Sequence, residues 1–210
     1  IVGFFSGIKL DWSANNDLVE NNMTNNDFGI WLHESIGNTI TSNNIQGGYA
    51  GVNLAWSRSN TVLNNNVTGN EYGIVLHWSS NNAADGNNLE ENGVGISLAW
   101  AGNNNLEENH MVNNAKSGWY GARLHASQHN TITRNIMKNS RYGIKLLYES
   151  SKNVITGNNI TDSFYGISLW YSSNNTIYHN NFINNTRQVD NHESTNSWDD
   201  DYPSGGNYWD

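Results

Sequence analysis

The sequence predicts an all-β protein folded as a parallel β-helix, a solenoid in which each repeat forms one coil. Three observations predict this fold. A tetrad of the form Gly-apolar-x-Leu recurs about every 22 residues, two columns of asparagine recur once in each repeat, and apolar residues alternate with polar ones as they do in strands. No apolar stripe has the spacing of a helix.

Composition excludes several other classes. The chain has 210 residues, no cysteine and one proline, so we expect neither disulfide bonds nor thiol chemistry. Charged residues make up 14% and hydrophobic residues 36%, which does not fit a disordered acidic tail or a membrane span. Ten Lys and Arg against 19 Asp and Glu give a net charge of −9, so no basic surface is expected for nucleic acid.

The tetrad defines eight repeats, and we number the coils by its glycine. These glycines are Gly7, Gly29, Gly51, Gly73, Gly95, Gly121, Gly143 and Gly166. Their spacing is 22 residues except for one step of 26 and one of 23. We therefore expect a four-residue insertion within 115–119 and a single-residue insertion near Ser151. At about 3.3 Å per residue and about 4.8 Å between coils, the coil perimeter is roughly 73 Å and the rod roughly 38 Å long.

Asparagine accounts for 41 residues, and two of its columns contain no other residue type. The first column is Asn16, Asn38, Asn60, Asn82, Asn104, Asn130, Asn153 and Asn175, and the second is Asn21, Asn43, Asn65, Asn87, Asn109, Asn135, Asn158 and Asn180. Asparagine tolerates left-handed backbone at a corner, and stacked amides hydrogen-bond to one another. We expect these columns to be structural ladders, with about four apolar side chains per coil, such as Ile74, Leu76, Ala84 and Leu89, in the core.

Two stretches of the last coils carry a family resemblance. Residues 165–177 (YGISLWYSSNNTI) and 174–185 (NNTIYHNNFINN) resemble the β-helix repeats of NosD-like proteins and of archaeal cell-surface proteins, and 198–210 resembles the segment that follows their last coil. The resemblance implies a right-handed parallel β-helix, in line with the general crossover rule. Proteins with such coils include adhesins, surface layers, carbohydrate-acting enzymes and copper-related NosD proteins, so the resemblance specifies function weakly.

The ends and the sequons suggest a place outside the cell. We expect coils over 1–186 and an aromatic, acidic capping segment over 187–210, together a fragment of a longer secreted or cell-surface protein. Glycosylation sequons begin at Asn22, Asn66, Asn159, Asn174 and Asn184. Three of these directly follow the second asparagine column, where burial would block a glycan. Asn184 is therefore the preferred candidate.

Aromatic residues gather at one corner of the predicted coil. Candidates for contact with a ligand or partner are Trp12, Trp31, Trp56, Trp78, Trp100, Tyr148, Trp170 and Tyr171. Three readings are open: rings that cover one another as a ladder, rings that stack on sugars, and rings that contact another subunit. Sugar binding requires Trp56, Trp78 and Trp100 to be exposed and coplanar.

Metal sites have limited support in the sequence. His33, His77 and His125 share a column but occupy alternate coils, roughly 9.6 Å apart, which is too far for two imidazoles to share a metal ion. In the capping segment, Asp199, Asp200, Asp201 and Asp210 are candidate calcium ligands, because calcium prefers hard oxygen donors. No other cofactor is expected.

A catalytic pair of carboxylates is not apparent. Glycosidases require two carboxyl groups about 5–10 Å apart, and no outward column offers them on adjacent coils. A calcium-dependent lyase would need an aspartate cluster beside a base, and Arg123 and Lys145 lack one. The one candidate polar pocket consists of Asp11, His33 and Glu34.

We therefore expect an extracellular structural or adhesive domain without catalysis. Its partners would be other protein subunits or cell-surface glycans, in a homo-oligomer, filament or lattice, with neither nucleic acid nor a membrane span in this segment. The alternatives are a polysaccharide-binding or polysaccharide-cleaving enzyme domain and a NosD-like copper accessory protein.

Overall fold

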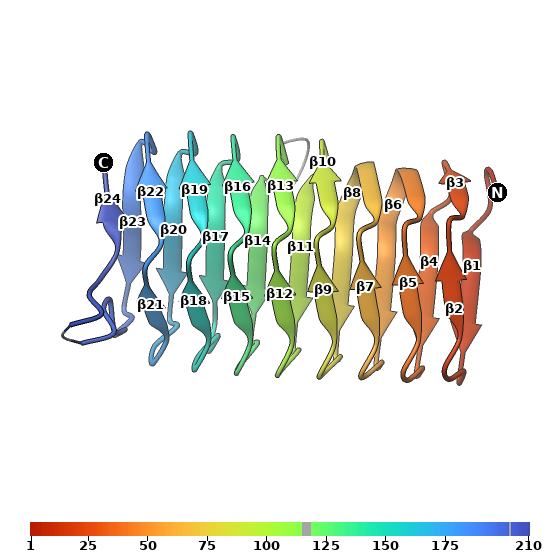
Figure 1. The fold of residues 1–210 in the computed structure, drawn as a ribbon, viewed down its shortest axis with the longest axis horizontal. Coiled ribbons are helices and arrows are strands. Elements are labelled where there is room, and N and C mark those ends of the chain that lie inside the picture. Colours follow the sequence, from red (N-terminus) through yellow and green to blue (C-terminus); the bar gives the residue numbers. More distant parts are fainter. Residues whose placement is uncertain (115–118, 202) are drawn as a thin grey trace.

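Each repeat folds into one coil of a parallel β-helix in the computed structural model, which describes residues 1–114, 119–201 and 203–210 (Figure 1). Every pairing between its named strands is parallel and joins residues one repeat apart, as Ile8 with Ile30 and Ile30 with Val52. Within the described residues, the smaller of the two sheets has eight strands, one for each coil. The predicted fold class is confirmed.

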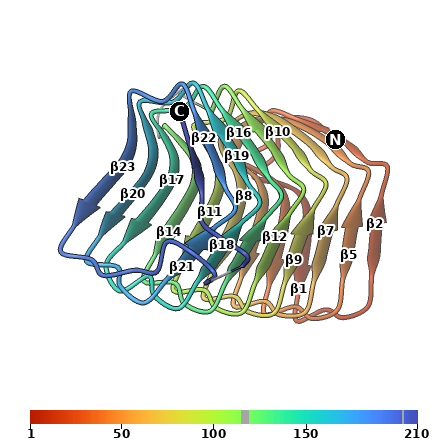
Figure 2. The same ribbon diagram turned by 60° about the vertical axis from the view of Figure 1, so that its left-hand side comes forward.

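Three walls of strands enclose the core, and Figure 2 shows how the strands of each wall stack along the rod. The first wall consists of β1 (Ser6–Asp11), β4 (Phe28–His33), the second halves of β6 (Asn44–Ala55) and β8 (Asn66–His77), β11 (Val94–Ala99), β14 (Tyr120–His125), β17 (Tyr142–Leu147), β20 (Tyr165–Trp170) and β23 (Arg187–His192). The second wall consists of β2 (Asp17–Val19), β5 (Thr39–Thr41), β7 (Thr61–Leu63), β9 (Ala83–Asp85), β12 (Asn105–Glu107), β15 (Thr131–Thr133), β18 (Val154–Thr156) and β21 (Thr176–Tyr178). The third wall consists of β3 (Asn22–Thr24), the first halves of β6 and β8, β10 (Asn88–Glu90), β13 (His110–Val112), β16 (Ile136–Lys138), β19 (Asn159–Thr161), β22 (Asn181–Ile183) and β24 (Tyr208–Trp209).

The tetrad glycine is required because the coils approach closely at that position. A Cβ atom on Gly73 would lie 2.5 Å from the carbonyl oxygen of Gly95, and one on Gly29 would lie 2.6 Å from that of Gly51. These contacts are with backbone, which cannot rotate away. The repeat therefore keeps glycine wherever the third wall turns into the first.

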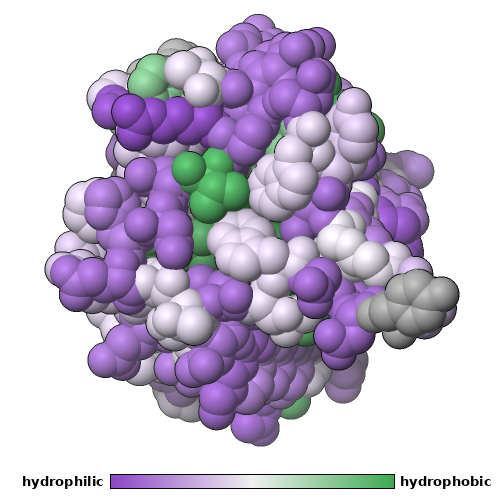
Figure 3. Space-filling view, turned by 90° about the vertical axis from the view of Figure 1, so that its left-hand side faces the viewer, coloured by the Kyte–Doolittle hydropathy of each residue, from purple (hydrophilic) through white to green (hydrophobic). Residues whose placement is uncertain are grey.

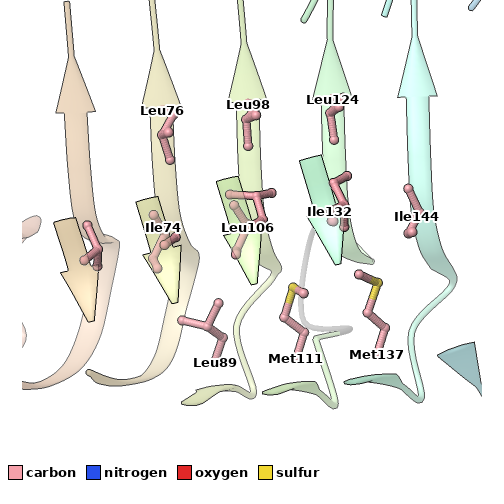
Figure 4. Close-up of a cluster of buried hydrophobic side chains, with 14 of the residues drawn as sticks. Ile74, Leu76, Leu89, Leu98, Leu106, Met111, Leu124, Ile132, Met137 and Ile144 are labelled. Carbon is pink, nitrogen blue, oxygen red and sulfur yellow. The ribbon is translucent and has the colours of Figure 1, made fainter. Parts of the chain in front are cut away.

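The inward side chains of successive coils stack into one continuous apolar core. In coil 4, Ile74, Leu76, Ala84 and Leu89 are all buried, as predicted. Figure 4 shows how the same positions are filled along the rod, with Leu89, Met111 and Met137 stacked in one column. Because each coil covers the apolar residues of its neighbours, stability accumulates along the rod.

The two asparagine columns form hydrogen-bonded ladders, as predicted. The side-chain amide of Asn65 donates to Asn87 Oδ1 at 3.0 Å and to the carbonyl oxygen of Ile40 at 2.9 Å, and Asn87 Oδ1 also accepts the backbone N–H of Asn65 at 2.9 Å. The left-handed backbone lies one residue earlier than expected, at Asn15, Gly37, Ser59 and their equivalents. The ladder asparagines follow this turn, which directs their amides into the rod.

Two further ladders were not anticipated. Ser35, Ser57 and Ser79 link coils at the first corner, where the N–H of Ser35 donates to Ser57 Oγ at 3.1 Å. At the third corner, the N–H of Asn70 donates to Asn92 Oδ1 at 3.0 Å. The serine column contains one alanine, and the asparagine column contains glycine and serine, which makes both less visible in the sequence than the two invariant columns.

The expected insertions have different outcomes. The four-residue insertion falls mainly on 115–118, which lie outside the described residues. The single-residue insertion is found at Tyr148 and Glu149, which both adopt left-handed backbone. As a result, Ser150 Oγ donates to the carbonyl of Leu147, three residues back, whereas Ser127 Oγ reaches only two residues back to His125.

The capping segment first continues the rod and then folds over its end. Strand β23 adds to the first wall beside β20. The indole of Trp209 stacks on the ring of Phe182, with centroids 4.7 Å apart, and Trp198 packs against the core. Figure 3 views this end, where apolar side chains are visible among hydrophilic ones. No helix that could cross a membrane is found in the described part of the chain.

Candidate functional site

The outer face of the first wall carries a column in which the size of the side chain changes along the rod. Its members are Lys9, Trp31, Asn53, Val75, Ser97, Arg123, Lys145, Ser168 and Asp190, joined in register from strand to strand. Coils 1 and 2 place long or bulky side chains here, as do coils 6 and 7. Coils 3 to 5 place Asn53, Val75 and Ser97, so the face is lower in the middle of the rod.

A groove of about 300 Å³ occupies this low region. Its lining consists of Phe28, Tyr49, Asn53, Tyr72, Val75, His77, Ser97, Ala99 and Arg123. The aromatic residues contact one another along one side, with ring centroids 5.6 Å apart for Phe28 and Tyr49 and 5.3 Å for Tyr49 and Tyr72. The groove therefore combines an aromatic side with amide, hydroxyl, imidazole and guanidinium groups.

Arg123 is the cation of the groove. Its Nε atom is buried and has no hydrogen-bond partner among the described residues. The guanidinium lies over the ring of Tyr120 at 5.9 Å. Beside it, burial and then the charge of Arg123 lower the pKa of His125, and burial lowers the pKa of His77 in the groove. Both imidazoles are thus held toward the neutral form.

Next to the groove, Lys145 is satisfied within the protein. Its Nζ donates to Ser168 Oγ at 2.6 Å, and Ser168 donates to Asp190 Oδ2 at 2.6 Å. The ammonium also lies over the rings of Tyr142 and Trp170, at 4.7 and 4.6 Å. Burial lowers the pKa of Lys145 to about 8, partly opposed by the charge of Asp190.

Asp190 is held in the charged form by its neighbours. Burial alone would raise its pKa, but hydrogen bonds from Ser168 and Trp170, followed by the charges of His192 and Lys145, lower it overall. His192 Nε2 lies 3.1 Å from Asp190 Oδ1. The cation of Lys145 therefore has a partner carboxylate, two coils away and connected through one hydroxyl.

The aromatic corner borders the same face. Four tryptophans of this corner are exposed and have left-handed backbone: Trp12 (73% exposed), Trp56 (54%), Trp78 (49%) and Trp100 (46%). The indoles of Trp78 and Trp100 stack at 5.2 Å with their planes 6° apart. Each indole of this pair therefore has one of its two faces covered by the other. Further along the rod, Tyr148 and Tyr171 stack in the same way at 6.3 Å.

Histidines fill the spaces beside the indoles. The ring of His77 lies 5.6 Å from that of Trp56 and 5.5 Å from that of Trp100, and His125 lies 5.2 Å from Trp100. Trp31 lies on the flat face instead, where it packs against Phe28 at 4.9 Å. Trp170 lies over Lys145 and within 4.6 Å of the His192 ring.

Asp11, His33 and Glu34 do lie together. His33 Nδ1 is 2.7 Å from Asp11 Oδ1, and His33 Nε2 is 3.8 Å from Glu34 Oε1. Hydrogen bonds from His33 and then Lys9 lower the pKa of Asp11. The imidazole thus separates the two carboxylates. Next to them, a hollow of about 340 Å³ is lined by Trp12, Glu34, Ser35, Ile36, Trp56 and Arg58, because Glu34 replaces the tryptophan of the column.

The described residues contain no group of three His, Cys, Asp or Glu that could hold a metal ion. In the capping segment, Asp199 and Asp201 line one hollow, whereas Asp200 and Asp210 are not among its lining residues. The three methionines, Met23, Met111 and Met137, are buried in the core. Their thioethers are therefore packing groups.

The sequon asparagines differ in exposure from what was expected. Asn22 and Asn66 are exposed although they directly follow ladder asparagines, because they point outward from the third wall. They belong to an outer ladder in which Asn66 Nδ2 donates to Asn44 Oδ1 at 2.8 Å. Burial therefore does not distinguish them from Asn184, which is also exposed.

The groove was not predicted from the sequence. The signal was the run of small residues at 53, 75 and 97 between larger ones. The aromatic side was harder to find, since Tyr49 lies one residue out of register with Phe28 and Tyr72 relative to the tetrad glycine.

Similarity searches place the chain among known β-helix proteins. The model of the family described as periplasmic copper-binding protein (NosD) matches residues 4–71 and 44–210. No curated protein matches the chain. Solved structures with the same fold include the A-module of mannuronan C-5 epimerase AlgE6 from Azotobacter vinelandii, with a TM-score of 0.65, 18% identity, and coverage of 88% of this chain and 63% of that one.

Two further structures extend the comparison. The periplasmic alginate epimerase AlgG matches with a TM-score of 0.52 and 18% identity over 86% of this chain and 50% of its own. The alginate lyase from Paenibacillus sp. str. FPU-7 matches with a TM-score of 0.53 and 9% identity, over 96% and 87%. The chain thus spans less than two thirds of either epimerase, and these likenesses establish the fold. The match of the family model over nearly the whole chain shows that this protein is a member of the NosD family of β-helix proteins.

Proposed function

We propose that this domain binds an extended carbohydrate on the outer face of the first wall. The observation that carries the proposal is the groove over coils 3 to 5, which has aromatic rings along one side and convergent polar groups elsewhere. Aromatic rings stack on the apolar faces of sugars, and a few placed polar groups orient the ligand. A groove of about 300 Å³ lies at the lower end of the range for small-molecule sites.

The hollow between Trp12 and Trp56 offers a second contact. Both indoles are exposed, and Trp56 also borders His77 of the groove. Unlike Trp78 and Trp100, neither indole is stacked against another indole among the described residues. A glycan chain that extends beyond the groove would find its next aromatic platform here.

The structural neighbours support a polysaccharide ligand at the level of the fold. They include two epimerases and a lyase whose names refer to mannuronan or alginate. Since one fold hosts many functions, the groove and not the likeness specifies the proposal. A periplasmic family and a periplasmic epimerase also support a location outside the cytoplasm.

Binding without hydrolysis agrees best with the groove. Glycosidases use two carboxyl groups, and the lining residues of the groove include none. The two carboxylates at Asp11 and Glu34 lie on either side of His33, which contacts both, instead of facing a common space. The proposal is therefore carbohydrate binding without hydrolysis.

The test is a titration of the 210-residue chain with a panel of oligosaccharides, with binding measured by isothermal titration calorimetry. Tyr72→Ala should weaken binding at least about tenfold, because it removes one ring of the aromatic side; alanine scans of base- and ring-stacking aromatics give losses of this size. Tyr178→Ala is the matched control, since Tyr178 ends β21 on the second wall. Equal affinity in both variants, or no binding to any oligosaccharide, would refute the proposal.

A contact surface for protein subunits is the second candidate. The stacked pair Trp78 and Trp100 is exposed at a corner of the rod, with one face of each indole covered by the other. An exposed aromatic pair can pack against another protein, as an adhesive or lattice-forming domain would require. Sedimentation velocity of Trp78→Ala and the unmodified chain distinguishes this candidate, because only a subunit contact predicts a change in association.

Copper binding, which the family description names, does not fit the described residues. They form no cluster of three His, Cys, Asp or Glu ligands, indole rings separate His33, His77 and His125 from one another, and the methionine thioethers are buried. Thioether and imidazole are the ligands that copper prefers. We therefore derive no copper chemistry for this chain.

A further inference from the structure

We propose that Arg123 binds a carboxylate, so that the ligand of the groove is an acidic polysaccharide built from uronic acids. This inference rests on the proposed carbohydrate-binding function and adds the class of sugar. It follows from the position of one cation in the groove and from the charges around it.

Several cations of the described residues have a partner within the protein, and Arg123 does not. Lys9 pairs with Asp11, Lys138 with Asp162, and Arg134 with Glu107 and Glu108. Lys145 reaches Asp190 through Ser168. No ion pair or hydrogen bond to the Arg123 side chain is found within the described residues, although its Nε atom is buried.

The remaining arginines without a carboxylate are in a different situation. Arg58, Arg141 and Arg187 are exposed, so water solvates their guanidinium groups. Arg123 is half-buried between Ser97 and Lys145 in the first wall. A partly desolvated cation without a partner is costly, and an anion from the ligand would offset that cost.

The surroundings of Arg123 favour a carboxylate on a sugar. No lining residue of the groove is acidic, so an incoming anion meets no like charge there. The guanidinium fork matches the two oxygens of a carboxylate, and the rings of Tyr49 and Tyr72 provide a surface for the pyranose. Ser97 is 6% exposed and lies beside Arg123 in register, where its hydroxyl can bind a neighbouring sugar oxygen.

The protein as a whole is acidic, with a net charge of −9, which would repel a polyanion from most of its surface. The groove has Arg123 and no acidic residue in its lining, so a polyanion would bind there in preference to the rest of the surface. Lys145 contributes less to this attraction, because Asp190 compensates its charge.

The experiment compares matched ligands on the unmodified 210-residue chain: oligomannuronate and oligogalacturonate, each as the free acid and as the methyl ester, which removes the charge and keeps the sugar. Because the ester lacks the charge that Arg123 would bind, at least one acid should bind at least about tenfold more tightly than its ester, and rising salt should reduce the difference. Arg123→Gln should abolish the preference, Arg123→Lys should retain part of it, and Arg134→Gln should retain all of it.

The outcomes separate the two proposals. Equal affinity for acid and ester overturns the role of Arg123 and leaves carbohydrate binding in place. Failure of every saccharide to bind overturns both. If Arg123→Gln does not fold, the acid–ester preference and its salt dependence in the unmodified chain decide the question.

Discussion

The buried asparagine ladder should contribute far more to stability than the exposed one, and two adjacent residues allow a matched comparison. Asn65 is buried, whereas Asn66 points outward from the third wall. Replacing Asn65 by alanine leaves the N–H of Asn43 without the Oδ1 it donates to at 3.0 Å, and leaves the carbonyl of Ile40 without its amide donor at 2.9 Å. The carbonyl of Leu63 still accepts from Ser42, so it is not stranded.

The stranded N–H of Asn43 costs about 1–3 kcal/mol and the lost bond to the Ile40 carbonyl about 1 kcal/mol, so Asn65→Ala should lower the free energy of unfolding by about 2–4 kcal/mol. Among the described residues, the side chain of Asn66 exchanges hydrogen bonds only with those of Asn44 and Asn88, at 2.8 Å each, on the exposed face. Water can replace these, and Asn66→Ala should change stability by about 0.5 kcal/mol or less.

Equilibrium unfolding in urea, with fluorescence and circular dichroism as independent probes, measures both values. The slope against urea concentration should be the same in both variants, since neither changes how much surface unfolding exposes. A loss for Asn65→Ala no larger than that for Asn66→Ala would show that the inner ladder is not a main source of stability.

Two further predictions concern the backbone and the buried lysine. Gly73→Ala should destabilise the rod by more than about 2 kcal/mol, because its Cβ would lie 2.5 Å from the carbonyl oxygen of Gly95. Gly69→Ala should cost about 1 kcal/mol, because it adds only the strain of left-handed backbone in open space. Urea unfolding that ranks the two variants in the opposite order would contradict this. Burial lowers the pKa of Lys145 from 10.5 to about 8, so between these values the unfolded chain binds more protons and the free energy of unfolding should rise with pH; in Lys145→Met this rise should be smaller, and an unchanged pH profile would count against it.

The sequence was sufficient for the fold because the columns that specify it are strictly periodic. Glycine recurs where two coils come too close for a side chain, and leucine recurs where the side chain packs in the core. The ladder asparagine recurs where a backbone N–H at a corner needs a hydrogen-bond acceptor. The backbone detail was less accessible. Left-handed geometry falls on the residue before each ladder asparagine, a position occupied by Asn, Gly, Ser, His, Lys, Glu and Arg, so no single residue type marks it.

The candidate site was harder to predict for the opposite reason. The column of residues 53, 75 and 97 predicts a groove only once the strands are placed in register. Small side chains form a groove only where the side chains on the neighbouring coils are large. The same applies to Lys145 and Asp190, which are 45 residues apart in sequence and are joined by Ser168 only because two successive coils stack. In the sequence we looked for pairs of carboxylates on adjacent coils and found none, and that criterion does not detect a lysine and an aspartate that are connected through a hydroxyl.

These observations indicate how a solenoid of this kind acquires a specific site. The repeat must be maintained inside the rod, where each ladder residue satisfies its neighbours, but the outward positions of a strand are free to change without cost to the core. A run of small outward residues lowers the face over a few coils, and one unpaired cation at the end of that run gives the groove a charge preference. Changing Ser97 to a larger residue should therefore close the site while leaving the fold intact, whereas the same change at Asn65 would disrupt the rod.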